Sequence, residues 1–353
     1  MKRFFSSLAT LAISFAVALV LGEIVVRAVF KDQTVMFPRY HTDYRYGEYT
    51  LRGIRPNAEF WHTSIDGSWK FVTNSRGLRD AREFPYEKPA GTLRVLALGD
   101  SHTQGYEVRQ EATYAAVLER SLNANGFKAE VLNAGVSGFS TAEALAYLEA
   151  EGHRYQPDVV VLGFFANDYE DNLKAGLFAL ENGQLVARKR DHLPGVKIQN
   201  AIYAVPGITW LSENSYFYSV AFNTVWVQFK NMAAAHAKEQ AFDYAVATKT
   251  KSKYDVDLAA ALVERMHAYC QRRGIRFIVV DIPEAPAPYK VSKSISFNTD
   301  AELVDVSKLY APYAGAVEAH LAHGHNHISE FTHALIGAEL GRRISDKRIS
   351  EKQ

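Results

Sequence analysis

The sequence has very little cysteine and almost no net charge, and both scarcities exclude classes of protein. Among its 353 residues there is one cysteine, Cys270, which excludes a disulfide framework and makes a cysteine-based metal site a poor interpretation. The formal net charge is +1, and no basic tract has interleaved aromatic residues, so nothing favours nucleic acid as a partner. Internal repeats and low-complexity tracts are also missing, while 48% hydrophobic residues suffice for a large core.

Charge is also missing from a long stretch near the N-terminus. After Lys2 and Arg3 the sequence is uncharged from Phe4 to Gly22, about 19 residues, which is close to the length of a membrane-spanning helix. A cleaved signal peptide and an uncleaved anchor are the two interpretations. The poor cleavage site around Gly22 and the apolar residues resuming at 24–26 favour an anchor. The basic residues before the span predict a single-pass protein of the inner (cytoplasmic) membrane, with its main domain periplasmic or extracellular.

Composition divides the chain into three parts. Residues 1–30 form the anchor or signal segment, and 31–91 form a juxtamembrane segment with short strands, including a hairpin that turns at Asp66-Gly67. Residues 92–345 form the main domain, which carries an insertion at about 172–255. The aromatic-rich part of this insertion could cover a site as a lid, pack on the core or lie near the membrane.

From Arg94 onward, short apolar strands alternate with amphipathic helices. The predicted strands are RVLALGD (94–100), AEVLNAGVSG (129–138), PDVVVLGFFAND (157–168), IRFIVVDIPEAP (275–286) and AELVDVSKL (301–309). The third is almost wholly apolar, as expected where helices cover both faces of a sheet. One intervening helix begins with the capping-box pattern Ser140-x-x-Glu143. Repeated strand–helix–strand units predict an α/β fold with a parallel sheet.

Polar residues gather where three of these strands end. The first strand ends in GDS at Ser101, the second in NAGVSG at Gly138, and the third in the pair Asn167-Asp168. Ligands bind at the carboxyl ends of strands in such sheets. Before the final predicted helix, the stretch HGHNHISEFTH contains four histidines: His323, His325, His327 and His333. A serine, a histidine base and backbone or amide donors are the groups that acyl transfer requires.

These blocks together resemble the SGNH superfamily, also called GDSL-type esterases and lipases, in its membrane-anchored bacterial form. The resemblance implies that Ser101 is the nucleophile and that His327, six residues before His333, is the base. It also implies that the Gly138 N–H and the Asn167 amide stabilise the oxyanion, with no cofactor and no metal. The fold it implies is a three-layer α/β/α arrangement with a central parallel sheet (flavodoxin-like), preceded by a transmembrane helix.

One position departs from the family pattern. Where the family has an aspartate two residues before the base, this chain has His325, and three residues before the base it has Gly324. Three interpretations stay open. A Ser–His dyad could act with a backbone carbonyl holding the histidine, an acid from elsewhere could reach it (Asp305 or Asp281), or the protein could be a weak or inactive relative.

The function that follows is a serine esterase acting through an acyl-enzyme outside the cytoplasm. Its partners would be an ester-bearing small molecule or an envelope glycan or lipid, together with the membrane. The alternatives are an O-acyltransferase that moves acetyl groups to or from envelope polysaccharide, and a catalytically silent envelope module. Zinc binding by the C-terminal histidines is a weaker interpretation, because their spacing matches no recognised zinc signature.

Simpler structural roles are also available for several of these residues. Ser101 and Gly138 could serve only as turn residues, and Asn167 could cap a helix. Asp168 reads as structural rather than catalytic. His102 follows the serine directly, and we expect its side chain to point away from it.

Overall fold

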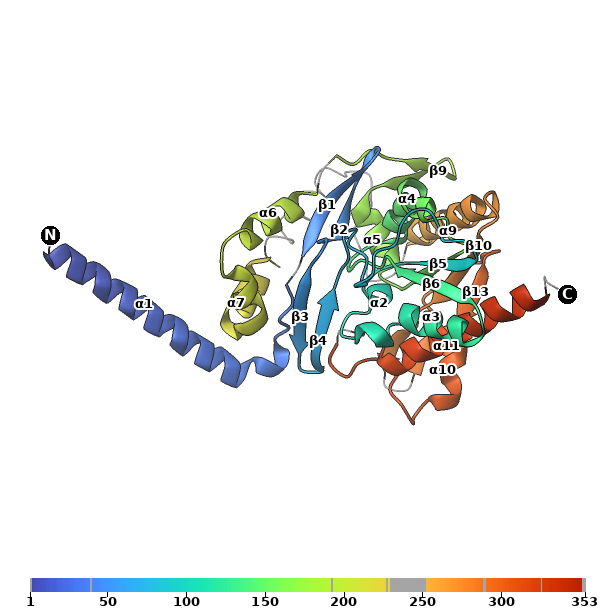
Figure 1. Ribbon diagram of the computed structural model, residues 1–353. Helices are drawn as coiled ribbons and strands as arrows, with labels where there is room; N and C mark the ends of the chain where they lie inside the picture. The colour runs from blue at the N-terminus through green and yellow to red at the C-terminus, as the bar shows by residue number, and fades with distance from the viewer. Residues whose placement is uncertain are drawn as a thin grey trace.

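The computed structural model describes residues 2–38, 40–191, 193–226, 228, 252–287, 290–324 and 326–350. Its centre is a five-stranded sheet in the order β6-β5-β7-β10-β13, with all neighbouring strands parallel (Figure 1). The strands are β5 (Thr92–Leu98), β6 (Lys128–Asn133), β7 (Val159–Phe164), β10 (Arg276–Asp281) and β13 (Glu302–Asp305). Counted along the chain, this order is 2-1-3-4-5, the flavodoxin-like arrangement. The predicted fold class is therefore confirmed.

Helices cover both faces of the sheet, so its strands have no solvent-facing side. Every residue of β5 and of β7 is buried. Alternate residues of β5 face opposite ways: Val95 and Ala97 pack in the cluster beneath α3 and α11, while Leu96 and Leu98 pack in the cluster beneath α4 and α9. These four helices are α3 (Tyr114–Ala124), α4 (Thr141–Ala150), α9 (Lys253–Gln271) and α11 (Glu330–Ser350). The continuous apolar runs follow from this double cover.

Helix starts follow the local signals in the sequence. The capping box predicted at Ser140 and Glu143 is present at the start of α4, with the serine accepting from the Glu143 N–H and the glutamate accepting from the Ser140 N–H. Thr113 caps α3 in a similar way through its hydroxyl. Cys270 is buried near the end of α9, and burial raises the pKa of its thiol to about 12. It is a packing residue, as its isolation in the sequence suggested.

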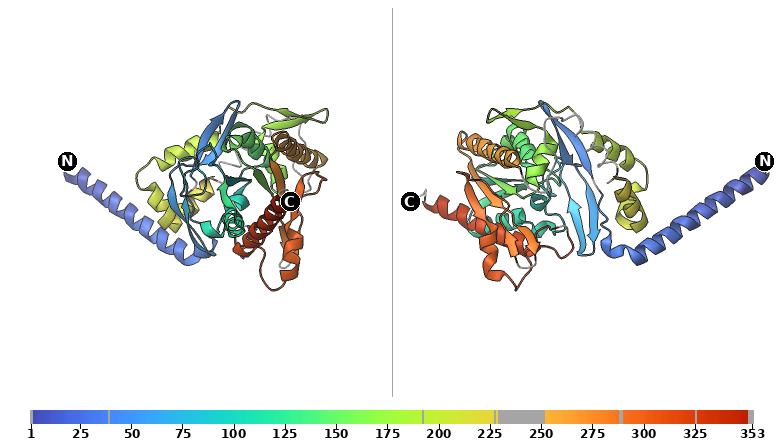
Figure 2. Two further views of the ribbon diagram at one scale, coloured as in Figure 1. Left: turned by 45° about the vertical axis from the view of Figure 1, so that its right-hand side comes forward. Right: turned by 180° about the vertical axis from the view of Figure 1, so that it is seen from behind.

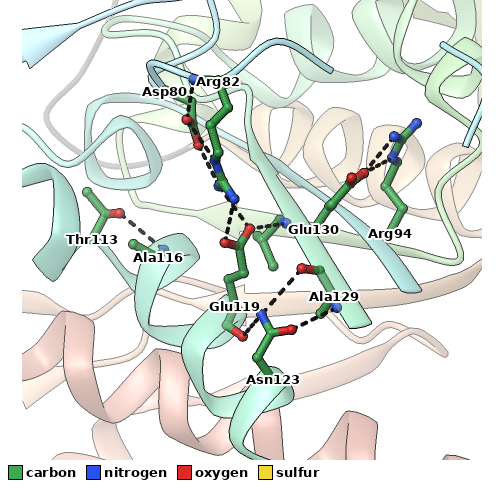
Figure 3. Close-up of polar contacts among 10 residues, drawn as sticks. Asp80, Arg82, Arg94, Thr113, Ala116, Glu119, Asn123, Ala129 and Glu130 are labelled. Carbon is green, nitrogen blue, oxygen red and sulfur yellow. Dashed lines mark hydrogen bonds and ion pairs between the residues drawn. The ribbon is translucent and has the colours of Figure 1, made fainter. Parts of the chain in front are cut away.

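A polar network ties α3 to strand β6 at the edge of the sheet (Figure 3). Glu119 of α3 accepts from the Val131 N–H at 2.8 Å and from both terminal nitrogens of Arg82, at 2.8 and 3.0 Å. Asn123, one turn later, accepts from the Ala129 N–H at 3.0 Å. Side chains of one helix thus satisfy backbone groups of the neighbouring strand.

We expect Glu119→Ala to lower the free energy of unfolding by about 1–3 kcal/mol, because it leaves the buried Val131 N–H without its acceptor. The loss is measured by urea unfolding of the full chain in detergent. Glu119→Gln is the matched control, since its amide oxygen can still accept that bond, and it should lose less. Equal losses in the two variants would show that the charge of Glu119, rather than its acceptor oxygen, stabilises the fold.

The N-terminal part consists of a long helix and two hairpins. Helix α1 (Lys2–Val29) projects away from the rest of the chain, and the hairpins stand between the central sheet and helices α6 and α7 (Figures 1 and 2). The hairpin strands are β1 (His41–Tyr46), β2 (Tyr49–Ile54), β3 (Glu59–Ser64) and β4 (Gly67–Val72). Ser64 pairs with Gly67, so the turn predicted at Asp66-Gly67 is present.

The region between β7 and α9 contains a hairpin and short helices. These are β8 (Phe178–Glu181), β9 (Gln184–Ala187), α6 (Pro194–Tyr203), α7 (Ile208–Asn214) and helical residues 216–226. Tyr216 is buried with Val26 and Met36, so the aromatic-rich segment packs against the C-terminal end of α1. Residues 229–251 of the predicted insertion lie outside the described residues.

The remaining elements are short. They comprise helices α2 (Ser101–Gln104), α5 (Asp168–Ala175) and α10 (Val306–Tyr310), strands β11 (Glu284–Ala287) and β12 (Lys290–Ser292), and 3-10 helices at Lys31–Gln33, Gln110–Ala112, Gly152–Tyr155 and Ala311–Tyr313.

Candidate active site

Ser101 follows the carboxyl end of β5, whose neighbours in the sheet are β6 on one side and β7 on the other. The connections from β5 to β6 and from β6 to β7 run in opposite directions across the sheet. Gly99 follows the strand with a φ of +147°, and a Cβ there would lie 2.8 Å from the Gly163 carbonyl oxygen of β7, so only glycine fits. Asp100 then caps helix α2 by accepting from the His102 N–H at 2.9 Å. Ser101 is the first residue of that helix, so its own N–H has no intrahelical acceptor. This is the topological switch point, where such sheets bind ligands.

His327 makes two hydrogen bonds that fix its role. Its Nε2 lies 2.8 Å from the Ser101 Oγ, and its Nδ1 lies 2.7 Å from the Gly324 carbonyl oxygen. A carbonyl oxygen only accepts, so Nδ1 carries the proton and Nε2 is the acceptor for the serine hydroxyl. The two residues are 226 positions apart in the sequence. The geometry therefore brings together the serine and the histidine that the sequence singled out.

The two acids that we considered as a third member, Asp281 and Asp305, have partners of their own. Asp281 accepts from the Ser294 and Ile295 N–H groups, at 2.8 and 3.1 Å. Asp305 pairs with Lys293 at 2.8 Å. Both carboxylates thus have partners on the segment 293–295. The backbone carbonyl of Gly324 is what holds the far nitrogen of the imidazole.

The second block, residues 134–138, lies directly beside the first. The Val136 N–H donates to the Gly99 carbonyl at 3.1 Å, and the Ser137 N–H donates to Gln104 Oε1 at 3.1 Å. Gly138 has a φ of +79°, in the left-handed region that glycine adopts readily. Its carbonyl accepts from Arg52 of strand β2. Sequence reasoning missed Arg52, because nothing in its neighbourhood indicates that the N-terminal hairpin reaches this loop.

Asn167, from the third block, precedes helix α5 and points at acidic neighbours. Its Nδ2 donates to Asp171 Oδ2 at 3.1 Å. Burial raises the pKa of Asp100 to about 7, while hydrogen bonds from the His102 N–H and from the Asn167 side chain pull that pKa down, so Asn167 also lies against the residue preceding Ser101. Asp168 accepts from the Thr141 N–H at 2.6 Å, which is the structural role expected for it.

Aromatic rings enclose the imidazole of His327. The ring of Tyr106 stacks on it, with centroids 4.4 Å apart and planes at 29°. The His102 ring lies 4.8 Å away, so it packs against the histidine of the pair rather than standing apart from the site. Burial lowers the pKa of His102 well below its ordinary value, which keeps this neighbour neutral. Sequence reasoning did not identify Tyr106, although it lies only five residues after the serine.

The other C-terminal histidines have separate partners. His333 accepts from the Tyr114 N–H at 3.0 Å, and His320 lies 2.8 Å from the Pro283 carbonyl oxygen. His323 lies 3.0 Å from Asp66 of the N-terminal hairpin, and His325 is outside the described residues. Within the described ranges, no group of three or more His, Cys, Asp or Glu side chains could hold a metal ion.

His333 makes the folded state sensitive to acid. Burial lowers its pKa to about 3, whereas an unfolded histidine titrates near 6.5. Between these values the unfolded chain binds more protons, so this residue destabilises the protein as the pH falls below about 6.5. We expect its contribution to the free energy of unfolding to drop by about 2 kcal/mol between pH 7 and pH 5.

Urea unfolding of the wild type and of His333→Asn at both pH values measures this contribution. Asparagine can accept from the Tyr114 N–H but does not titrate, so the variant should lose less stability on acidification than the wild type. The raised pKa of Asp100 changes the stability with pH in the opposite direction. Asp100 is present in both proteins, so its contribution cancels in the difference between them. Parallel pH dependences would contradict the assignment.

A cavity of about 410 Å³ opens elsewhere, next to the network of Figure 3. Its lining includes Lys70, Arg79, Asp80, Arg82 and Glu119, and it contains neither Ser101 nor His327. Within it, Arg82 pairs with Asp80 and with Glu119. The cavity is therefore separate from the serine and histidine at the strand ends.

A doubly wound parallel sheet with a hydrogen-bonded serine and histidine at its switch point defines the class, an α/β/α hydrolase. Comparison with known proteins gives the family. The sequence profile of the GDSL-like Lipase/Acylhydrolase family matches residues 97–335, more than half of the chain. The chain belongs to this family, as the motifs predicted.

Individual relatives are distant. An arylesterase of Vibrio mimicus is 33% identical over 75 residues, which are 21% of this chain and 38% of that protein, so the chain spans under two fifths of this relative. Among solved structures, a lipase/acylhydrolase from Enterococcus faecalis is 18% identical with a TM-score of 0.40, covering 72% of this chain and 96% of that one. An acetyl-xylooligosaccharide esterase (Axe2, R55A mutant) from Geobacillus Stearmophilus is 17% identical with a TM-score of 0.39, covering 72% and 94%.

Proposed function

We propose that the protein is a serine esterase that works through an acyl-enzyme, with Ser101 as nucleophile and His327 as general base. The observation that carries this proposal is the 2.8 Å contact between Ser101 Oγ and His327 Nε2, with Nδ1 held by Gly324. A serine hydroxyl becomes nucleophilic when a positioned base accepts its proton. The tautomer fixed by the Gly324 carbonyl presents the required lone pair to that hydroxyl.

The reaction proceeds in two balanced halves. Ser101 Oγ forms a bond to the ester carbonyl carbon while its proton passes to His327 Nε2, and the carbonyl oxygen becomes an oxyanion. The intermediate collapses, the C–O bond to the alcohol breaks, and the alcohol leaves with the proton from His327. Water then attacks the acyl carbon and gives a proton to Nε2; the bond from that carbon to Ser101 Oγ breaks, Oγ takes the proton back from Nε2, and the acid leaves.

We propose three donors for the oxyanion: the N–H groups of Ser101 and Gly138 and the side-chain amide of Asn167. The first stands at the start of α2, and the second lies in a loop fixed to that helix through Gln104. Asn167 would turn an amide N–H from Asp171 toward the oxyanion when substrate binds. Donors aimed at developing charge contribute a large share of the rate in such sites.

The absent family aspartate does not make the protein a silent module in this proposal. In a triad, the acid holds the imidazole in its tautomer and stabilises the imidazolium. Here the Gly324 carbonyl already performs the first task. Hydrolysis of p-nitrophenyl acetate by the full chain in detergent tests the proposal, and a rate equal to that of Ser101→Ala would refute it.

Transfer of the acyl group to a hydroxyl other than water uses the same two residues. The experiment that separates the two activities runs the assay with and without an oligosaccharide acceptor and measures both acetate and acetylated sugar. We propose hydrolysis as the main reaction, so acetate should dominate at every acceptor concentration. Acetylated sugar formed faster than acetate would instead identify an O-acyltransferase of envelope polysaccharide.

We also propose that α1 anchors the protein in the inner membrane, with the catalytic domain outside the cytoplasm. Within Arg3–Val29, a window of 18 residues has a mean hydropathy of 2.3, and none of that window is buried by the rest of the chain. Near the end of this helix Glu23 accepts from Ser215 and from the Phe217 N–H, which attaches the helix to the folded part. Substrates would then be esters of the envelope. A C-terminal alkaline phosphatase fusion should be active, and an inactive fusion would contradict this topology.

A further inference from the structure

Glu107 is a buried carboxylate that none of the chemistry above uses. It is only 1% exposed and follows Tyr106, the residue whose ring stacks on His327. Its backbone has a φ of +55°, in the left-handed region that glutamate seldom adopts. Buried charges and such backbone conformations are both costly, and they persist where the surroundings hold them for a function.

The turn that carries Glu107 is clamped by Arg79. Nη1 of this buried guanidinium donates to the Gln104 and Gly105 carbonyls, at 2.7 and 2.5 Å, and Nη2 donates to the Val108 carbonyl at 2.6 Å. Three carbonyls of one turn are thus bound to a single planar group. The backbone around Glu107 is held firmly, so its carboxylate has a fixed place.

That place is against Gly324, which is next to the position where the family has its acid. A Cβ built on Gly324 would overlap Glu107 Oε2. The carboxylate therefore occupies the space into which a side chain at position 324 would extend, three residues before His327. It reaches there from the loop after Ser101 rather than from the loop before the base.

The surroundings keep this carboxylate ionised. Burial alone would raise the pKa of Glu107, but the neighbouring His62, Ser64 and His327 side chains bring that pKa below its ordinary value. His62 Nε2 lies 3.5 Å from Glu107 Oε1, a contact that becomes an ion pair when the imidazole is protonated. A negative charge therefore stands beside the loop that binds His327.

We propose that Glu107 is the relocated acid of this site, a positioning residue that supports His327 through the Gly324 turn and stabilises its imidazolium by charge. The inference rests on the proposed roles of Ser101 and His327. Of the three interpretations of the missing aspartate, it agrees with the one in which an acid from elsewhere in the chain supports His327. The sequence analysis did not name Glu107 as that acid. Two groups then share the roles of the family's aspartate. The Gly324 carbonyl fixes the tautomer of His327, and Glu107 supplies the negative charge.

The first test is Glu107→Gln in the full chain, which removes the charge and keeps the shape. We expect kcat for p-nitrophenyl acetate to fall by about 10- to 100-fold with KM nearly unchanged; the loss is smaller than for a triad aspartate because the tautomer is held separately. Glu111→Gln, an exposed glutamate on the same loop, is the matched control and should retain wild-type kcat. An unchanged kcat in Glu107→Gln would overturn the proposal.

A transplant separates a role in catalysis from a role in folding. Glu107→Gly suits the left-handed backbone and removes the carboxylate that a side chain at Gly324 would overlap. Gly324→Asp then places a carboxylate three residues before the base, in the loop that binds it, with a small shift of Leu321, whose side chain lies 2.8 Å from the added Cβ. The double variant should recover most of the kcat lost by Glu107→Gly alone. Failure to recover, with thermal unfolding of both variants like that of the wild type, would contradict the proposal.

The outcome is distinguishable from a failure of the proposed function. If Ser101→Ala abolishes turnover while Glu107→Gln does not reduce it, the esterase stands and Glu107 is merely structural. If the wild type itself hydrolyses no ester, the nucleophile assignment and the inference about Glu107 are both wrong.

Discussion

Replacing Ser101 with alanine is expected to lower kcat/KM for p-nitrophenyl acetate by at least about 10³-fold, because no other group can form the acyl-enzyme. The side chain is half-buried and its recorded partner is His327, so the substitution should leave the fold intact. The residual rate should match that of an oxyanion site acting on water alone. Initial rates with the full chain in detergent measure the effect.

The control for this variant is Ser75→Ala, an exposed serine bonded to Glu83 and not part of the crevice. It should retain wild-type kcat/KM. Thermal unfolding of Ser101→Ala should coincide with that of the wild type. Turnover that survives in a folded Ser101→Ala protein would mean that a different nucleophile acts.

Replacing His327 with alanine should lower kcat by about 10³-fold or more, because the serine hydroxyl loses the base that accepts its proton. The substitution removes an imidazole that packs against the rings of Tyr106 and His102. It therefore leaves a space of the size of an imidazole ring. Added imidazole should enter this space and restore part of the rate. Rates with and without imidazole, extrapolated to saturating ester, measure both effects.

His333→Asn is the matched histidine control for this prediction. His333 is buried against Tyr114 and accepts a backbone N–H, so its replacement by a neutral acceptor should change kcat by only a few-fold at pH 7, about the scale of an indirect effect. A large loss in His333→Asn together with full activity in His327→Ala would reverse the assignment of the base.

The fold could be predicted from the sequence because its signals are local and repeated. The strand Val159–Phe164 is wholly buried, and its run of apolar residues reports that burial directly. The capping box at Ser140 and the turn at Asp66 are set by neighbours a few residues away. The alternation of strands and helices then predicts a parallel sheet, and the family resemblance implied its flavodoxin-like arrangement.

The serine–histidine pair could be predicted for a different reason. Ser101 stands at a strand end, and the spacing of His327 and His333 matches a known family, so resemblance supplied a contact across 226 positions. Nothing in the sequence separates an acid that hydrogen-bonds His327 from one that does not. Asp281 and Asp305 were reasonable candidates by position, yet local backbone N–H groups and Lys293 hold them.

The residues that hold the loops around Ser101 and His327 could not be predicted from the sequence. Arg52 approaches Gly138 from an N-terminal hairpin, and Glu107 approaches Gly324 from the loop after Ser101. Both contacts are set by tertiary packing between segments without periodicity or a motif. A positive φ at Glu107 leaves no trace in the sequence, because the residue there is not the glycine that usually marks such a backbone.

The central claim is that Ser101 becomes acylated during turnover. Its most direct test is to quench the full chain with acid during steady-state hydrolysis of p-nitrophenyl acetate and to locate the acetyl group by peptide mass spectrometry. We predict one acetyl group on the peptide that contains Ser101, present in the wild type and absent from Ser101→Ala. An acetyl group on another residue that is removed at the rate of turnover would contradict the account.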